Sequence, residues 1–194
     1  MLTEGFTIVC DAGVHPAHTG LTALPFIDNL DWSTVDALLI THFHLDHAAA
    51  LTYIMEKTNF CDGKGKVYMT HPTKAIYRFL MSDFVRISNA GSDRMLFDES
   101  EMLASWRQIE AVDYHQEVVL GGGFRFTPYH AGHVLGGDRG RVARAKLLAA
   151  NTVELFLHDP LVVGHRVAAV CRRVGHGVRG GVEGTGDGRG GAVH

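Results

Sequence analysis

Short apolar runs alternate with segments of helical periodicity over most of the chain. Apolar runs bounded by polar or glycine-rich residues predict strands at 6–10, 35–41, 66–69, 117–120 and 124–127. Apolar residues at three- and four-residue spacing predict helices at 47–57, 73–81 and 100–109, and Pro72 suits the first turn of the second helix. The triple glycine at 121–123 joins the last two strands into a hairpin. This alternation predicts a layered α/β fold with its polar chemistry on loops at strand ends.

The composition changes abruptly after Gly137. Residues 1–137 carry nine Lys and Arg against 16 Asp and Glu, a net charge of −7, whereas residues 138–194 carry nine against five, a net charge of +4. Nine of the twenty residues from 175 to 194 are glycine, which buries little apolar area for its ordering cost. We therefore expect a folded unit at 1–137 and a disordered or mistranslated tail at 138–194. A flexible linker or a basic nucleic-acid-binding arm is the alternative for the tail.

Cysteine usage and hydropathy exclude several classes of protein. The three cysteines (Cys10, Cys61 and Cys171) are odd in number and widely spaced, so they form neither a disulfide framework nor a CxxC zinc site. Free thiols in a reducing compartment are expected. No apolar run is long enough for a membrane span, and the N-terminus lacks the pattern of a secretory signal. No membrane partner is expected.

The strongest chemical signal is a group of histidines and an aspartate directly after the apolar run 35–41. Residues two apart in an extended segment point to the same side, so His42 and His44 can bind one metal. The following turn offers Asp46 and His47 to a second metal. Imidazole and carboxylate are zinc ligands, and two neighbouring zinc ions suit the hydrolysis of phosphate esters. A metal-free surface histidine cluster is the plain alternative.

A third ligand for the first metal has to come from another strand end. The segment after the predicted strand 124–127 supplies His130 and His133, with glycines that allow the backbone to approach a crowded metal. From spacing alone, His133 is either a ligand or a structural histidine, and His130 favours a structural role.

Four segments together resemble a known family. Residues 42–47 match the HxHxDH signature of the metallo-β-lactamase superfamily, and residues 11–16, 69–78 and 130–136 are similar to its β-CASP branch. Within that branch, the chain resembles the endonuclease subunits of the cleavage and polyadenylation specificity factor, with the fungal form nearest. The resemblance runs from about residue 6 to residue 136.

The resemblance implies a fold, a chemistry and a cellular setting. The fold is an αββα sandwich, here incomplete because only its N-terminal portion is matched. His42, His44 and His133 match ligands of a first zinc, whereas Asp46 and His47 match ligands of a second zinc in the catalytic centre. Asp11 orients the histidine loop. The implied reaction is hydrolysis of a phosphodiester of pre-mRNA through a metal-bridging hydroxide, in the nucleus, together with the other subunits of the cleavage and polyadenylation complex.

The chain departs from the family after Gly136. The family continues with a strand and a Thr-Gly-Asp whose aspartate bridges both metals, whereas this chain reads Gly-Asp-Arg-Gly-Arg from residue 137. Asp159 and Asp187 are poor substitutes, and the abrupt change suggests a retained intron or a frameshift. From the resemblance we also expect the second domain of the family to be missing. We therefore expect about one tightly bound zinc per chain rather than the two of the family, and an inactive enzyme in this form.

Two other function classes stay open. One is a small metallo-hydrolase of thioesters or lactones, which also carries HxHxDH but is disfavoured by the stretch at 70–78. The other is a non-catalytic truncated product. A diiron oxidoreductase is disfavoured because it would carry a glutamate at the position of His44. The net charge of −7 over residues 1–137 is opposite to what phosphate-backbone binding requires, so RNA would be held by absent parts or by partners.

Overall fold

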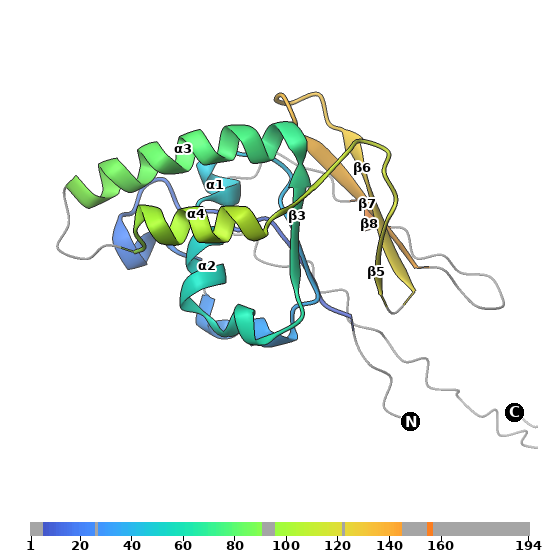
Figure 1. Cartoon of the computed structure of the whole chain (residues 1–194), viewed down its shortest axis with the longest axis horizontal. Coiled ribbons are helices and arrows are strands. Elements are labelled where there is room, and N and C mark those ends of the chain that lie inside the picture. Colours follow the sequence, from blue (N-terminus) through green and yellow to red (C-terminus); the bar gives the residue numbers. More distant parts are fainter. Residues whose placement is uncertain (1–5, 26, 91–95, 122, 145–154, 157–194) are drawn as a thin grey trace, which may run out of the picture.

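Two four-stranded sheets lie face to face, and the helices cover the free face of one of them (Figure 1). The computed structural model describes residues 6–25, 27–90, 96–121, 123–144 and 155–156. The described residues therefore form three layers, a helical layer and two sheets, and no described helix covers the outer face of the second sheet. This arrangement confirms the predicted incomplete αββα sandwich.

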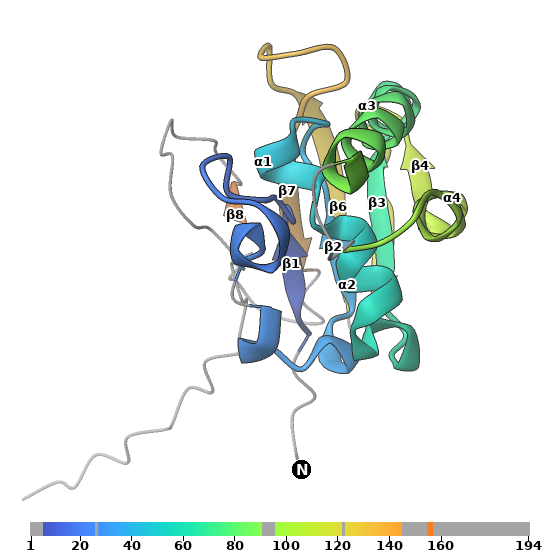
Figure 2. The ribbon, with the colours of Figure 1, turned by 90° about the vertical axis from the view of Figure 1, so that its left-hand side faces the viewer.

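The first sheet is parallel throughout, with its strands in chain order. It contains β1 (Ile8–Cys10), β2 (Ala37–Leu39), β3 (Lys66–Thr70) and β4 (Glu110–Val112). Both faces are buried, as expected for a parallel sheet. Alternate side chains serve two cores: Leu38 packs toward the helices, whereas Leu39 packs toward the second sheet. Because the strands are parallel, their carboxyl ends meet at one edge, where the polar loops lie (Figure 2).

In the described ranges, the helical layer contains four α-helices and four short 3₁₀ turns. The α-helices are α1 (Leu45–Ala48), α2 (Leu51–Lys57), α3 (His71–Ala90) and α4 (Glu99–Gln108). The 3₁₀ turns are η1 (Gly20–Ala23), η2 (Ile27–Asn29), η3 (Trp32–Thr34) and η4 (Asn59–Asp62). A reciprocal capping box between Asp98 and Glu101 fixes the start of α4. No helix among the described residues combines the length and the apolarity that crossing a bilayer requires.

The second sheet is antiparallel. It contains β5 (Val118–Gly121), β6 (Phe124–His130), β7 (Asp138–Arg144) and β8 (Leu155–Phe156). Aromatic rings from the two sheets meet in the core between them, where the ring centroids of Tyr68 and Phe126 are 5.2 Å apart. This packing holds the two sheets together and brings the β6–β7 loop to the same edge as the carboxyl ends of β1 and β2.

Most of the predicted elements are confirmed, two predicted helices have different bounds, and two strands were not predicted. The predicted helix 47–57 is two helices, because the Ala50 amide donates to the Ala12 carbonyl (2.8 Å) and not to the preceding helical turn. The helix predicted at 73–81 begins at His71 and extends to Ala90. The strands β4 and β7 were not predicted, and β7 occupies the first seven residues of the expected tail. The rest of that tail lies outside the described residues, except for β8.

Candidate metal centre

Asp11 connects the ends of the first two strands. It follows β1 in a left-handed backbone conformation (φ 62°), which is uncommon for a residue other than glycine. Its amide donates to the Leu39 carbonyl at 2.8 Å. Its carboxylate accepts hydrogen bonds from the Thr41 amide (2.8 Å) and the Thr41 hydroxyl, and it lies 2.9 Å from Nδ1 of His47. One carboxylate therefore orients both ends of the histidine loop.

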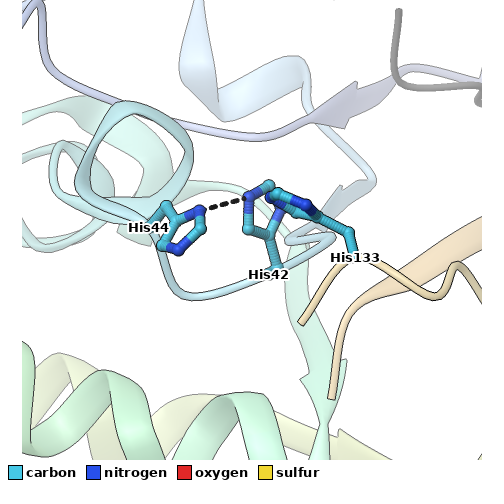
Figure 3. A group of neighbouring side chains, drawn as sticks. All are labelled: His42, His44 and His133. Atoms are coloured by element: carbon cyan, nitrogen blue, oxygen red, sulfur yellow. Dashed lines mark hydrogen bonds between the residues drawn. The ribbon is translucent and has the colours of Figure 1, made fainter. Parts of the chain in front are cut away.

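His42 and His44 come from the extended segment between β2 and α1. Nε2 of His42 lies 3.1 Å from Nδ1 of His44, as Figure 3 shows. The Thr41 hydroxyl lies 2.9 Å from Nδ1 of His42, which leaves Nε2 of this ring directed toward the other histidines. His42 is only 3% exposed, and His44 is half-buried. The i, i+2 spacing thus places both imidazoles on the same side of the chain.

His133 reaches the same place from the β6–β7 loop. Its ring centroid lies 5.0 Å from that of His42 and 5.2 Å from that of His44. One ligand atom from each of the three histidines lies within 4.8 Å of the others, and these three form the only such group of histidine, cysteine or acidic residues in the described part of the chain. Figure 3 shows the three rings converging from the two loops.

The loop that carries His133 is anchored by two threonines that the sequence did not single out for this role. The hydroxyls of Thr70 and Thr73 lie 2.6 and 2.9 Å from the Gly136 carbonyl. Gly136 has a φ of 83°, and a Cβ atom there would lie 2.6 Å from the Thr73 amide nitrogen. The close approach of the loop to the start of α3 therefore requires glycine. The stretch at 69–78 thus helps to position the third histidine.

The electrostatics of the three-histidine group fit a metal ion. Burial, together with the neighbouring imidazole of His47, lowers the pKa of His42 to about 4. His42 is therefore neutral at pH 7, which is the protonation state that a metal requires. A tetrahedral zinc with Zn–N bonds of about 2.0–2.1 Å places its nitrogens roughly 3.3 Å apart, and the His42–His44 nitrogen pair is already at 3.1 Å. The three histidines therefore form a group that could hold a metal ion.

Asp46 and His47 lie beside the three-histidine group but are not part of it. The His47 ring centroid is 4.1 Å from that of His42, and Nε2 of His47 lies 3.6 Å from Oδ2 of Asp46. Asp46 is exposed. With Nδ1 of His47 held by Asp11, its Nε2 and the Asp46 carboxylate form an adjacent nitrogen–oxygen pair. Their role as ligands of a second metal stays a prediction.

Asp138, the first residue of the predicted tail, places a further carboxyl group near the metal centre. Its amide donates to the Thr41 carbonyl at 2.9 Å, and in the β6–β7 pairing it is the partner of His130. Burial, together with the Asp11 carboxylate, raises the pKa of Asp138 to about 8. No pattern in the sequence marks this position, because its burial arises only when β7 pairs with β6 and contacts the end of β2.

We expect Asp138→Asn to change how stability depends on pH. With a folded-state pKa of about 8 and an ordinary value of 3.8, the folded chain keeps the Asp138 proton that the unfolded chain has lost. The Asp138 carboxyl group therefore lowers the free energy of unfolding as pH rises from about 4 to about 8.

In urea unfolding of the zinc-free chain, Asp138→Asn should have a higher free energy of unfolding than the wild type at pH 8. The difference should be much smaller at pH 5. Asp113→Asn, at a position 79% exposed, is the control and should show no such difference. Parallel pH profiles for the wild type and Asp138→Asn would contradict the assignment.

Comparison with known proteins places the chain in a family. The family described as "Metallo-beta-lactamase superfamily domain" matches residues 1–143. The chain is 84% identical over 133 residues to "Endoribonuclease YSH1" of Mycosarcoma maydis and 59% identical over 133 residues to "Endoribonuclease ysh1" of Schizosaccharomyces pombe. It is 53% identical over 141 residues to "Endoribonuclease YSH1" of Saccharomyces cerevisiae. Each match covers 69% of this chain but only 15%, 17% and 18% of the respective relative.

The family match and the geometry concern the same part of the chain. Residues 1–143 include both sheets up to β7 and all three histidines that converge at their edge. The high identity to fungal relatives also supports the branch that the sequence motifs indicated. The chain belongs to the metallo-beta-lactamase superfamily.

Proposed function

We propose that this chain carries the metal-binding part of a zinc-dependent endoribonuclease that cleaves pre-mRNA before polyadenylation. The observation that carries the proposal is the convergence of His42, His44 and His133 in a chain 84% identical to an endoribonuclease over 133 residues. The chain spans about one sixth of the length of these curated relatives, so we propose for it the metal-binding part of the activity and not the whole reaction. Its setting is the nucleus, with the other subunits of the cleavage and polyadenylation complex as partners.

The chain's own residues hold the metal and keep it oriented. His42, His44 and His133 would bind zinc from two loops, one after β2 of the first sheet and one after β6 of the second sheet. When bound, zinc supplies Lewis-acid chemistry, because it lowers the pKa of water and neutralises charge on a phosphate. Asp11 fixes the ring of His47 through Nδ1 and fixes Thr41 through its amide. These hydrogen bonds restrict the histidine loop to one arrangement, which favours metal binding.

One zinc per chain is the stoichiometry that the described residues support. Three imidazoles complete a zinc site when water takes the fourth position. Asp46 and His47 offer only two groups for a second ion, and two protein ligands bind zinc far more weakly than three.

A graft into a full-length relative tests the proposal. Residues 6–136 of this chain would replace the matching segment of the Mycosarcoma maydis endoribonuclease, and cleavage of a labelled RNA would be measured. We expect the graft to cleave RNA at a rate within about tenfold of the parent enzyme. The graft that carries His44→Ala should lose activity by at least about 100-fold. Removing a metal ligand has a larger effect than removing a residue that only orients a ligand.

The graft also separates the competing function classes. The same preparations would be offered a thioester and a lactone, because a small metallo-hydrolase would act on these substrates. A folded, zinc-loaded graft that leaves RNA intact, or that hydrolyses the thioester or the lactone faster than RNA, would overturn the proposal.

A further inference from the structure

Three hydroxyl groups hold the end of the β6–β7 loop. The hydroxyls of Thr70 and Thr73 both donate to the Gly136 carbonyl, at 2.6 and 2.9 Å. The Tyr114 hydroxyl donates to the next carbonyl, that of Gly137, at 3.0 Å. We call Thr70, Thr73 and Tyr114 the hydroxyl clamp. They come from the end of β3, the first turn of α3 and the segment after β4, so three separate segments hold one loop.

The hydroxyl clamp completes the hydrogen bonding of two buried carbonyl groups. A carbonyl oxygen has two lone pairs, and each of these two oxygens accepts two donors. The Gly136 carbonyl accepts both threonine hydroxyls, whereas the Gly137 carbonyl accepts the Tyr114 hydroxyl and the Ala131 amide (3.1 Å). Both threonines and both glycines are buried. Loss of one hydroxyl therefore leaves a buried acceptor with one donor fewer, which weakens the hold on the loop.

Two backbone hydrogen bonds connect the clamped end of the loop to the rest of the metal centre. The Gly137 amide donates to the Val134 carbonyl at 3.0 Å, and Gly136 has a φ of 83°, as in the third residue of a type II turn. The Asp138 amide donates at 2.9 Å to the carbonyl of Thr41, directly before the first of the three histidines. The two loops that carry the histidines are thus bonded to each other next to the hydroxyl clamp.

Of the three histidines, His133 depends most on such restraints. Its side chain is exposed, and the segment 131–137 contains three glycines, whereas His42 is only 3% exposed. A glycine-rich loop without restraints has many conformations, so fixing it around a metal ion costs conformational entropy. A loop that is already held in the metal-free chain loses less entropy on binding.

We propose that the hydroxyl clamp sets the metal affinity of the three-histidine group by fixing the loop that presents His133. Thr70, Thr73 and Tyr114 are positioning residues, because they lie outside the three-histidine group and act through two backbone carbonyls. The inference rests on the proposed function, since it gives these residues a role in the same zinc site.

The test removes single hydroxyls and keeps the shape of each side chain. Thr73→Val and Tyr114→Phe should each weaken zinc binding by about 10- to 100-fold, the range for losing a group that orients a ligand. Thr73→Ser should restore the affinity, because serine keeps the donor. Competition against a chromogenic chelator measures the zinc affinity, and urea unfolding of the zinc-free chain measures the stability.

Thr52→Val and Tyr77→Phe are the matched controls. They remove hydroxyls from the same two residue types in the buried contact between α2 and α3, where the two oxygens lie 3.2 Å apart. Both controls should lower the free energy of unfolding of the zinc-free chain but leave the zinc affinity unchanged. A role of the hydroxyl clamp in stability alone would give the clamp variants the same pattern as these controls.

A double-mutant cycle with His133→Ala shows whether the hydroxyl clamp acts through this ring. In the His133→Ala background, Thr73→Val and Tyr114→Phe should cause no further loss of zinc affinity, because the ligand that they position is gone. If Thr73→Val does not fold without zinc, Tyr114→Phe decides the question, since it keeps the ring and removes only the hydroxyl.

Three results would overturn the proposal: unchanged zinc affinity in the clamp variants, equal losses of affinity in the controls, or full additivity with His133→Ala. If the wild type binds zinc through the three histidines and the clamp variants bind it equally well, only this inference fails. If the wild type binds no zinc at the three histidines, both this inference and the proposed function fail.

Discussion

His133→Ala is expected to lower the affinity of the chain for zinc by at least about 100-fold. The remaining pair, His42 and His44, would leave the ion with two protein ligands in place of three, and zinc sites of this type need three or four. The His133 side chain is exposed on the β6–β7 loop, so its removal should leave both cores intact. Zinc content after dialysis, and competition against a chromogenic chelator, measure the effect.

His130→Ala is the matched control for this experiment. It removes the same ring from the same segment, three residues away, at a position outside the three-histidine group. Its zinc content should equal that of the wild type. If His133→Ala retained tightly bound zinc, the ion would be held elsewhere and the three-histidine site would be wrong.

Gly13→Ala is expected to destabilise the fold by about 3 kcal/mol, at the upper end of the cost of overpacking. A Cβ atom at residue 13 would lie 1.6 Å from the Asp46 carbonyl oxygen and 1.9 Å from its carbon. These are backbone atoms, so no side-chain rotation relieves the overlap. Hydrogen bonds from Ala12 to His47 (2.6 Å) and from Val14 to Leu45 (3.0 Å) hold the segment against α1 on both sides of the glycine.

The same substitution should weaken zinc binding, because α1 follows His44 directly and carries His47. Urea unfolding of the zinc-free chain and zinc titration measure the two effects. Gly20→Ala provides the control: it has a φ of 60° but no atom within 4 Å of the new Cβ, so only backbone strain of about 1 kcal/mol is expected. If Gly13→Ala and Gly20→Ala lowered the free energy of unfolding by similar amounts, crowding against Asp46 would not be the reason for glycine at position 13.

Patterns of apolar residues and glycines predicted the elements that depend mainly on residues close together in the sequence. The apolar runs ending near Cys10 and Leu39 gave the strands β1 and β2, and the triple glycine gave the β5–β6 hairpin. The strand β4 was missed because three residues carry too little alternation to distinguish a strand from a loop. The break between α1 and α2 was missed because it depends on a backbone bond to Ala12, which is distant in sequence.

The sequence alone determined which residues can act as metal ligands and at which positions of the chain they occur. The i, i+2 spacing of His42 and His44 is a property of any extended segment, so it could be read before the fold was known. Whether His133 is a ligand or a structural histidine could not be decided from spacing, because it lies more than eighty residues away.

Only the tertiary structure brought His133 to the other two rings, placed the Asp11 carboxylate on His47, and brought the half-buried Asp138 to the end of β2. The physical reason is that these contacts depend on the order of the strands and on how two sheets face each other. Spacing along one strand determines which side of the sheet a residue faces. Contacts between residues of different strands form only when both cores are packed.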